Sequence, residues 1–351
     1  ELPAAAPPPV RFAALRRDGG HTIERVGLVL PTSLCSAQIA RLAGERLTAR
    51  GVGRAAGVER FAALVHTEGC GVSGGPSEEM YARILLGYLT HPLVHVALLL
   101  EHGCEKTHND YMRSLLEGAG IEPEGFGWAS VQLDGGIAQV LDRVEGWFAQ
   151  RLALDGPPVR EEVGLGSLRL GMLAAGPLPA AAAAALALLA RWVVSAGGTV
   201  VVGDGSLAQS ADFRRALLPP AGELAPTLRH GEVAASPGFH VMARIGEPWV
   251  EALTGLGASG VEIILGHAGE HSLAGHPLVP VVQTSADPAV ASRFAGDLDV
   301  VLAPEVGSAE AGARALLECL VQVAGGAYRP RLAARGHTDF QISRGPLGVS
   351  L

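Results

Sequence analysis

Two cysteines of this chain lie in polar loops rather than in apolar runs. Cys70 lies in HTEGCGVSGG, residues 66–75, and Cys104 lies in EHGCEKTHND, residues 101–110. A cysteine that serves packing behaves as a small hydrophobe and is typically found among apolar neighbours. These two have histidines and acidic residues beside them instead, and such side chains bind metals and move protons.

A third cysteine, Cys35, follows the apolar run 25–31 in the segment PTSLCSAQIA. The three cysteines are 35 and 34 residues apart, which is about the length of one strand–helix–strand unit. Parallel strands deliver the loops at their carboxyl ends to the same edge of a sheet. We therefore expect Cys35, Cys70 and Cys104 to meet at one edge.

Three thiols at one edge point to a metal site, because thiolate binds metal and helix N-termini favour the thiolate form. Further candidate ligands stand close by in the sequence: His66, Glu68, His102, Glu105 and His108. Sulfur, imidazole and carboxylate donors together suit Fe²⁺ first, with Mn²⁺ or Zn²⁺ as alternatives. Three thiolates could also hold a [4Fe–4S] cluster. We predict Cys35, Cys70, Cys104 and His66 as the metal ligands; the alternative is that the cysteines are small residues packed at loop-to-helix junctions.

A second cluster, LGHAGEHSLAGHP, occupies residues 265–277 and contains His267, Glu270 and His271 directly after an apolar run. Histidine gains or loses a proton near neutral pH, so it is the usual general acid or base. We predict His267, His271 and Glu270 as catalytic groups. The alternative is a polar loop whose histidines are satisfied by backbone groups.

Composition limits the classes of protein that these clusters can serve. The chain has 351 residues, 48% of them hydrophobic and 18% charged, with a formal net charge of −8. This size and apolar content predict a globular protein of two domains. The scattered basic residues exclude nucleic acid as a partner. Four cysteines without a signal peptide indicate a reducing, cytoplasmic location.

The longest apolar stretch, residues 178–203, contains Arg191 and breaks at a pair of glycines. Its Ala-rich first half favours a helix and its Val-rich second half favours a strand. We therefore predict a helix followed by a buried strand, and no membrane span.

The remaining pattern alternates short apolar runs with longer helical segments, which is typical of parallel strands that are buried on both faces. The fold class that we predict is α/β, with two domains that each contain a mostly parallel β-sheet flanked by helices. The predicted strands are 25–31, 61–67, 94–101, 126–133, 168–174, 198–203, 261–266, 279–284 and 298–303. The predicted helices are 36–49, 77–89, 107–118, 136–151, 179–195, 287–294 and 308–323.

The polar, Pro-containing stretch 154–167 interrupts this pattern and predicts a domain boundary. We expect a Pro/Ala-rich linker over residues 1–12. An N-terminal α/β domain with the cysteine-bearing loops would follow over 13–157. A C-terminal α/β domain with the histidine-rich loop would occupy 158–351.

The cysteine-centred segments PTSLCSAQIA, TEGCGVSGG and EHGCEKTHND resemble, in order and spacing, those of the altronate/galactarate dehydratase family. The resemblance continues through VQLDGGIAQVLDRV, AGGTVVVGD, the 254–282 segment and the terminal HTDFQISRGPLG, and so covers nearly the whole chain. It implies a metal-dependent hydro-lyase, associated with Fe²⁺, that removes water from a sugar acid or related hydroxy acid to give a 2-keto-3-deoxy acid. It also implies that Cys35, Cys70, Cys104 and Glu105 form the site of the first domain, and we predict Glu105 as a catalytic group of that site.

The family further implies a small β-rich N-terminal module that this sequence does not contain. We expect a separate partner subunit to supply it, or the Pro-rich opening to be the rest of a linker to it. A homo-oligomer, with a small hydroxy acid as substrate, completes the expected set of partners.

Two segments depart from the family pattern. A GGSDG-like segment is replaced by GMLAAGPLPAAA, residues 171–182, and a SETPE-like segment is replaced by GDGSLAQ, residues 203–209. The second retains Asp204 and Ser206, which we predict to bind substrate together with Arg344, since arginine forks onto carboxylates; a surface ion pair is the alternative role of Arg344. The losses keep a second function open: a non-catalytic or regulatory homologue, or the large subunit of a complex, that keeps the fold and a closed structural metal site.

Overall fold

The chain divides into two compact units in a computed structural model that describes residues 2–68, 74–218, 223–244, 248–302 and 309–342. We call residues 24–159 and 340–351 the cysteine unit, and residues 1–23 and 160–339 the histidine unit. Each is an α/β unit with a parallel sheet flanked by helices, so the predicted fold class is confirmed.

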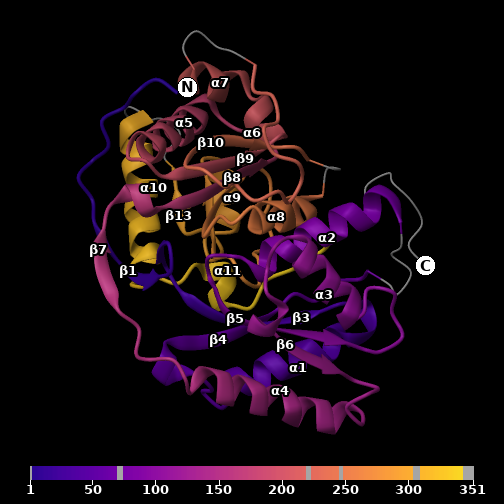
Figure 1. Cartoon of the computed structure of the whole chain (residues 1–351). Helices are drawn as coiled ribbons and strands as arrows, with labels where there is room; N and C mark the ends of the chain where they lie inside the picture. Colours follow the sequence, from indigo (N-terminus) through magenta and orange to yellow (C-terminus); the bar gives the residue numbers. More distant parts are fainter. Residues whose placement is uncertain (1, 69–73, 219–222, 245–247, 303–308, 343–351) are drawn as a thin grey trace. The chain divides into compact units, whose positions relative to one another are not determined.

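The cysteine unit contains a four-stranded parallel sheet of order β4-β3-β5-β6. Its strands are β3 (Arg25–Pro31), β4 (Val58–Ala63), β5 (Val94–Glu101) and β6 (Gly127–Ser130). Its helices are α1 (Leu34–Ala49), α2 (Gly75–Leu89), α3 (Asn109–Gly118) and α4 (Ile137–Leu152). Helices α1 and α4 lie along one face of the sheet, and α2 and α3 lie along the other (Figure 1).

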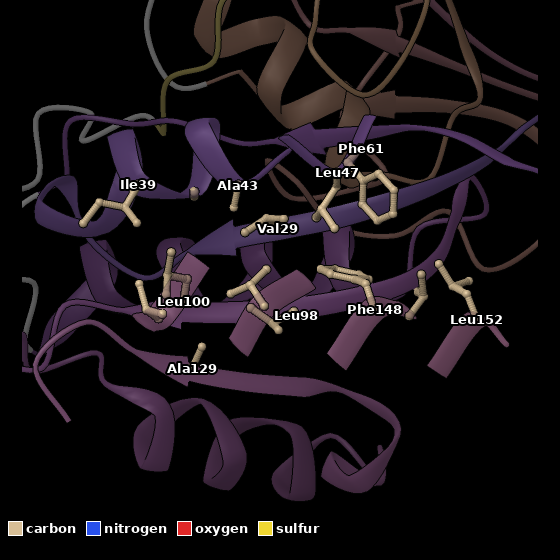
Figure 2. Close-up of a cluster of buried hydrophobic side chains, with 14 of the residues drawn as sticks. Val29, Ile39, Ala43, Leu47, Phe61, Leu98, Leu100, Ala129, Phe148 and Leu152 are labelled. Atoms are coloured by element: carbon tan, nitrogen blue, oxygen red, sulfur yellow. The ribbon is translucent and has the colours of Figure 1, made fainter. Parts of the chain in front are cut away.

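The face under α1 and α4 is closed by a hydrophobic cluster (Figure 2). Helix α4 places Val140, Val144, Phe148 and Leu152 four residues apart, so that they form one apolar stripe facing the sheet. The Phe148 ring meets the Phe61 ring edge-to-face, with centroids 4.9 Å apart. This packing holds the strands whose carboxyl ends carry the cysteine loops.

The histidine unit contains a six-stranded parallel sheet of order β10-β9-β8-β11-β12-β13. Its strands are β8 (Arg169–Ala175), β9 (Thr199–Gly203), β10 (Gly238–Met242), β11 (Ile263–Ala268), β12 (Val281–Ser285) and β13 (Val300–Val301). Its helices are α5 (Ala180–Ser195), α6 (Ser206–Gln209), α7 (Ala211–Leu217), α8 (Trp249–Ala258), α9 (Pro288–Arg293), α10 (Ala309–Ala324) and α11 (Arg331–Ala334).

A small antiparallel sheet of order β2-β1-β7 completes the histidine unit, with β1 (Phe12–Arg17), β2 (Gly20–Thr22) and β7 (Arg160–Val163). Residues 12–22, which the sequence analysis placed mainly in the N-terminal domain, therefore belong to the other unit. The tract before them lies against α5, because Arg191 donates hydrogen bonds to the carbonyls of Pro3 and Ala4. Its prolines lack N–H donors, but their carbonyls still accept.

One predicted strand is displaced along the sequence. β4 covers Val58–Ala63 rather than 61–67, because it is an edge strand whose exposed Glu59 interrupts the apolar pattern from which the strand was predicted. Residues 64–68 continue beyond it toward Cys70, which lies outside the described residues. In the part of the chain that the structure describes, no helix is long and apolar enough to span a membrane.

Candidate functional site

The strand order of the cysteine unit reverses beside its first strand. From β3 the chain moves to β4 on one side and then to β5 on the other, so the loops after β3 and β5 leave the sheet in opposite directions. Ligands of open α/β sheets bind at such a switch point, outside the carboxyl ends of the strands. Cys35 follows β3 and Cys104 follows β5, so two of the three predicted cysteines flank this point.

Glu105 joins the two loops at the switch point. Its Oε1 accepts hydrogen bonds from Thr32 Oγ1 at 2.9 Å, Ser33 Oγ at 3.0 Å and the His102 amide at 2.8 Å. Its Oε2 accepts from the amides of Gly103 at 2.7 Å and Cys104 at 2.9 Å. The residue is 3% exposed. Both oxygens are thus occupied, and the carboxylate fixes the loop that carries Cys104 to the end of β3.

The pKa of Glu105 lies below its usual value. Burial alone would raise this pKa, but hydrogen bonds from the backbone amides of His102, Glu105 and Gly103 and from the Thr32 hydroxyl stabilise the anion and outweigh it. Glu105 therefore stays ionised near neutral pH. These contacts position the loop that carries Cys104, and the catalytic role predicted for Glu105 stays a prediction.

Cys104 and His102 lie together on the outer side of this loop. The Cys104 sulfur is 3.4 Å from His102 Nδ1, and Gln132 Nε2 lies 3.4 Å from the same nitrogen. The amide nitrogen of Gln132 can only donate, so Nδ1 is the acceptor toward Gln132, and the Cys104 thiol lies within hydrogen-bond distance of the same nitrogen. Cys104 is exposed and His102 is half-buried. A thiol beside an accepting imidazole in a loop open to solvent is an arrangement that transfers protons.

His66 is turned away from such a role. Its Nε2 donates to the Pro31 carbonyl at 3.1 Å and its Nδ1 accepts from the Glu68 amide at 3.2 Å. Burial, with 1% of the residue exposed, lowers its pKa to about 4. The ring is neutral and both nitrogens are used, so this geometry leaves no nitrogen for a metal.

The donor set for iron is incomplete in the described residues. Glu105 and His66 are engaged, Cys35 is exposed in the first turn of α1, and Cys104 is paired with His102. Among described residues, no group of three or more histidine, cysteine or acidic side chains could hold a metal ion. The described residues alone therefore do not complete a metal centre, and Cys70 lies outside them.

The predicted catalytic and substrate-binding residues of the histidine unit lie at the ends of different strands. His267 is buried at the end of β11, and its Nε2 lies 3.3 Å from the Pro177 carbonyl. Glu270 and His271 are exposed in the loop that follows. Burial lowers the pKa of His267, which is therefore a neutral imidazole.

The predicted substrate-binding residues follow β9 in the same unit. Asp204 is half-buried, and Ser206 donates its hydroxyl hydrogen to the Ala174 carbonyl. Arg344 lies outside the described residues, so its predicted contact is not observed here. Two polar residues outside the predicted site, Gln132 and Thr284, lie beside His102 and His267 respectively.

Two family models match the sequence. The second-domain model of D-galactarate dehydratase/altronate hydrolase matches residues 15–150. The C-terminal-domain model of D-galactarate/altronate dehydratase matches residues 221–346. The chain belongs to the D-galactarate dehydratase/altronate hydrolase family. No individual curated protein matches it.

Membership of this family supports a dehydratase-type, hydro-lyase-like function. The second-domain match contains the loop that carries Cys104 and Glu105, and the C-terminal match contains the histidine-rich loop. Both polar clusters of the sequence thus lie in segments that the family models describe.

Proposed function

We propose that the chain is a hydro-lyase that removes water from a sugar acid or related hydroxy acid, with the Cys104–His102 pair as its proton-transfer group. The observation that carries this proposal is the 3.4 Å approach of the Cys104 sulfur to His102 Nδ1 at the switch point. The charged Glu105 supports it by holding the backbone of both residues in place.

The Cys104 and His102 side chains together account for every proton transfer in the reaction. In the thiolate–imidazolium form, the Cys104 thiolate takes the proton from the carbon next to the substrate carboxylate. The His102 imidazolium gives its proton to the hydroxyl leaving the adjacent carbon, which departs as water. The resulting enol rearranges to a 2-keto-3-deoxy acid. Transfer of the thiol proton to His102 then restores the starting pair.

Dependence on Fe²⁺, with Mn²⁺ or Zn²⁺ as alternatives, remains a proposal that requires Cys70 to join Cys35 and Cys104. Such an ion would bind the substrate carboxylate and stabilise the enolate when present. Metal and sulfide analysis of protein purified without oxygen tests this proposal. Loss of the metal in Cys70→Ser and Cys104→Ser variants is the expected result, and retention in both would contradict the ligand set.

A second part of the proposal concerns the exposed groups after β11. His271 and Glu270 are accessible to a ligand, whereas His267 is fully buried. We expect His271→Ala and Glu270→Ala to raise the KM for substrate, because these polar groups are available for binding. Unchanged kinetic constants in both variants would remove them from the site.

The deciding experiment is an anaerobic, iron-replete assay of a panel of sugar acids in D₂O. Turnover should yield a keto acid that carries deuterium at the carbon that lost the hydroxyl, because ketonisation adds a solvent proton there. Cys104→Ala and His102→Gln should each lower kcat/KM by about 100-fold or more. The matched control is Cys319→Ala, a half-buried cysteine on α10.

Two outcomes would count against the proposal. If the Cys104 and His102 variants retain turnover, the proton-transfer group lies elsewhere. If the whole panel yields no product, the chain is better described as the non-catalytic homologue, an alternative that the replaced segment at 171–182 favours.

A further inference from the structure

Three side chains donate hydrogen bonds to the backbone at the end of β3. The Pro31 carbonyl accepts from His66 Nε2 at 3.1 Å. The next carbonyl, that of Thr32, accepts from the Tyr81 hydroxyl at 2.7 Å and from the Thr107 hydroxyl at 2.9 Å. A buried carbonyl needs such a partner, because water does not reach it. Residues that are distant in the sequence therefore meet at two consecutive carbonyls.

The contacts around the Thr32 carbonyl are closed off from water. Thr32, Tyr81 and Thr107 are 0%, 1% and 2% exposed. Burial raises the pKa of Tyr81, so its hydroxyl keeps its hydrogen near neutral pH and donates it. A carbonyl oxygen has two lone pairs and can accept from both hydroxyls at once. Because the Thr32 amide also donates to the Leu100 carbonyl at 3.1 Å, the backbone of Thr32 is held from both sides.

This fixed backbone presents the Thr32 side chain to Glu105. Thr32 Oγ1 donates to Glu105 Oε1 at 2.9 Å, and the same carboxylate accepts from the amides of residues 102–104. Thr107 follows Glu105 by two residues in the same loop. The loop thus contacts Thr32 at two points, through Glu105 on its hydroxyl and through Thr107 on its carbonyl. A shift of the Thr32 backbone would disturb both points.

We propose that Tyr81 and Thr107 are positioning residues for the Cys104–His102 pair, and that they act through the Thr32 carbonyl that both hydroxyls hold. Tyr81, on α2, fixes this carbonyl from outside the loop, and Thr107 ties the loop itself to it. Proton transfer needs the reacting atoms in close contact, so a small displacement of the loop lowers the rate. The effect on catalysis rests on the proposed function, whereas the effect on the loop does not.

Amide hydrogen exchange of the full chain, without substrate, measures the loop directly. Tyr81→Phe removes one hydroxyl and keeps the ring. We expect the amides of residues 102–104 to exchange about threefold to tenfold faster, because a hydrogen bond that holds Thr32 is lost. Thr107→Val should have a similar effect, whereas Thr107→Ser retains the hydroxyl and should exchange as the wild type does. Exchange within β5 should not change, because its strand hydrogen bonds are not altered.

Tyr328→Phe is the matched control. The Tyr328 hydroxyl donates to Asp299 at 2.7 Å in the histidine unit, so this variant also loses one tyrosine hydrogen bond. It should leave exchange of the amides at 102–104 unchanged. An equal rise in the control would show a general loss of stability and would overturn the inference.

A double substitution tests whether Tyr81 acts through Thr32. Thr32→Val removes the hydroxyl that donates to Glu105, so the position of the Thr32 backbone no longer reaches the carboxylate by this route. Adding Tyr81→Phe to Thr32→Val should change exchange at 102–104 by less than about twofold, because the two substitutions break the same connection. Effects that multiply in full would overturn the proposed route.

Kinetics separates positioning from a purely structural role. In the dehydration assay, Tyr81→Phe and Thr107→Val should lower kcat about tenfold and leave KM within about twofold, because the proton-transfer pair is displaced while no substrate-binding group is removed. Thr107→Ser and Tyr328→Phe should keep the wild-type kcat. Unchanged exchange in both Tyr81→Phe and Thr107→Val, or faster exchange with an unchanged kcat, would overturn the inference. If the wild type shows no turnover, the proposed function fails, and the exchange result still decides whether Tyr81 and Thr107 hold the loop.

Discussion

The two switch points of this protein differ in how far their buried polar groups are satisfied. In the cysteine unit, Glu105 accepts five hydrogen bonds and closes the space between the loops after β3 and β5. In the histidine unit, the strand order reverses between β8 and β11, and beside this second switch point His267 and Thr284 each keep a buried atom without a partner among the described residues. At the switch point of the cysteine unit, both oxygens of the buried carboxylate have partners, and Cys104 and His102 lie on the outer side of the loop. The switch point of the histidine unit keeps two buried polar atoms unpartnered among the described residues.

The two switch points also differ in the charge state of their buried titratable group. The donors around Glu105 overcome burial and hold its carboxyl group in the charged form. Burial lowers the pKa of His267 more than the Pro177 carbonyl and the Asp287 charge raise it, and so keeps the imidazole neutral. A fixed charge such as that of Glu105 suits positioning.

The largest effect on stability is expected from removal of the Glu105 carboxylate. Glu105→Ala leaves five donors without their acceptor, and we expect a loss of about 3 kcal/mol or more of unfolding free energy. Glu105→Gln should cost less, because its amide oxygen still accepts while its NH₂ group faces donors. Urea unfolding followed by the fluorescence of Trp128 and Trp147 in the cysteine unit measures both.

Glu117→Ala, an exposed acid on α3, is the control and should change the unfolding free energy by less than about 0.5 kcal/mol. If Glu105→Ala costs no more than this control, the five contacts do not carry the stability of the loop. The hydrogen bonds to Glu105 would then not stabilise the cysteine unit, and the difference that we infer between the two switch points would be wrong.

The next largest effect is an acid-dependent loss of stability from His66. Its pKa is about 4 in the folded protein, whereas an unfolded histidine has a pKa near 6.5. Between these values the unfolded chain binds the extra proton, so stability is complete above pH 6.5 and falls as the pH drops toward 4. The difference amounts to about 3 kcal/mol, since one pKa unit is about 1.4 kcal/mol.

Unfolding free energies at pH 7 and pH 4.5 test this dependence. His66→Gln should flatten the pH dependence, because glutamine does not titrate but retains a donor for the Pro31 carbonyl. His271→Gln, at an exposed position, should leave it unchanged. An equal slope in wild type and His66→Gln would mean that another group dominates the acid response.

The sequence predicts the sheets well and the site less well, for a physical reason. Strands such as β3, β5 and β11 are buried, so their apolar runs can be recognised in the sequence alone. Residue type alone does not show whether a polar atom is already engaged. His66 was predicted as a ligand because it is a histidine near Cys70, but folding turns both of its nitrogens to backbone groups.

Other features depend on pairing between distant segments. Thr284 becomes significant only because β12 lies in register with β11, and Gln132 only because the loop after β6 reaches His102. β10 is half-exposed, so its short segment lacked the apolar run by which the other strands were recognised. Strand pairing of this kind is a tertiary property that no local pattern in a single sequence encodes.

The smallest expected effect gives the most direct comparison, because one substitution can be made at both switch points. Thr32 and Thr284 are both 0% exposed, but Thr32 donates to the Glu105 carboxylate at 2.9 Å whereas Thr284 Oγ1 is unpartnered within the described residues. Thr32→Val should cost about 2 kcal/mol, because a hydrogen bond to a charged group is lost. Thr284→Val should change the unfolding free energy of the ligand-free protein by less than about 0.5 kcal/mol, since no bond is broken and valine has the same shape. Equal costs at the two positions would mean that the Thr284 hydroxyl already has a partner in the folded chain, and the two switch points would then not differ in how far their buried polar groups are satisfied.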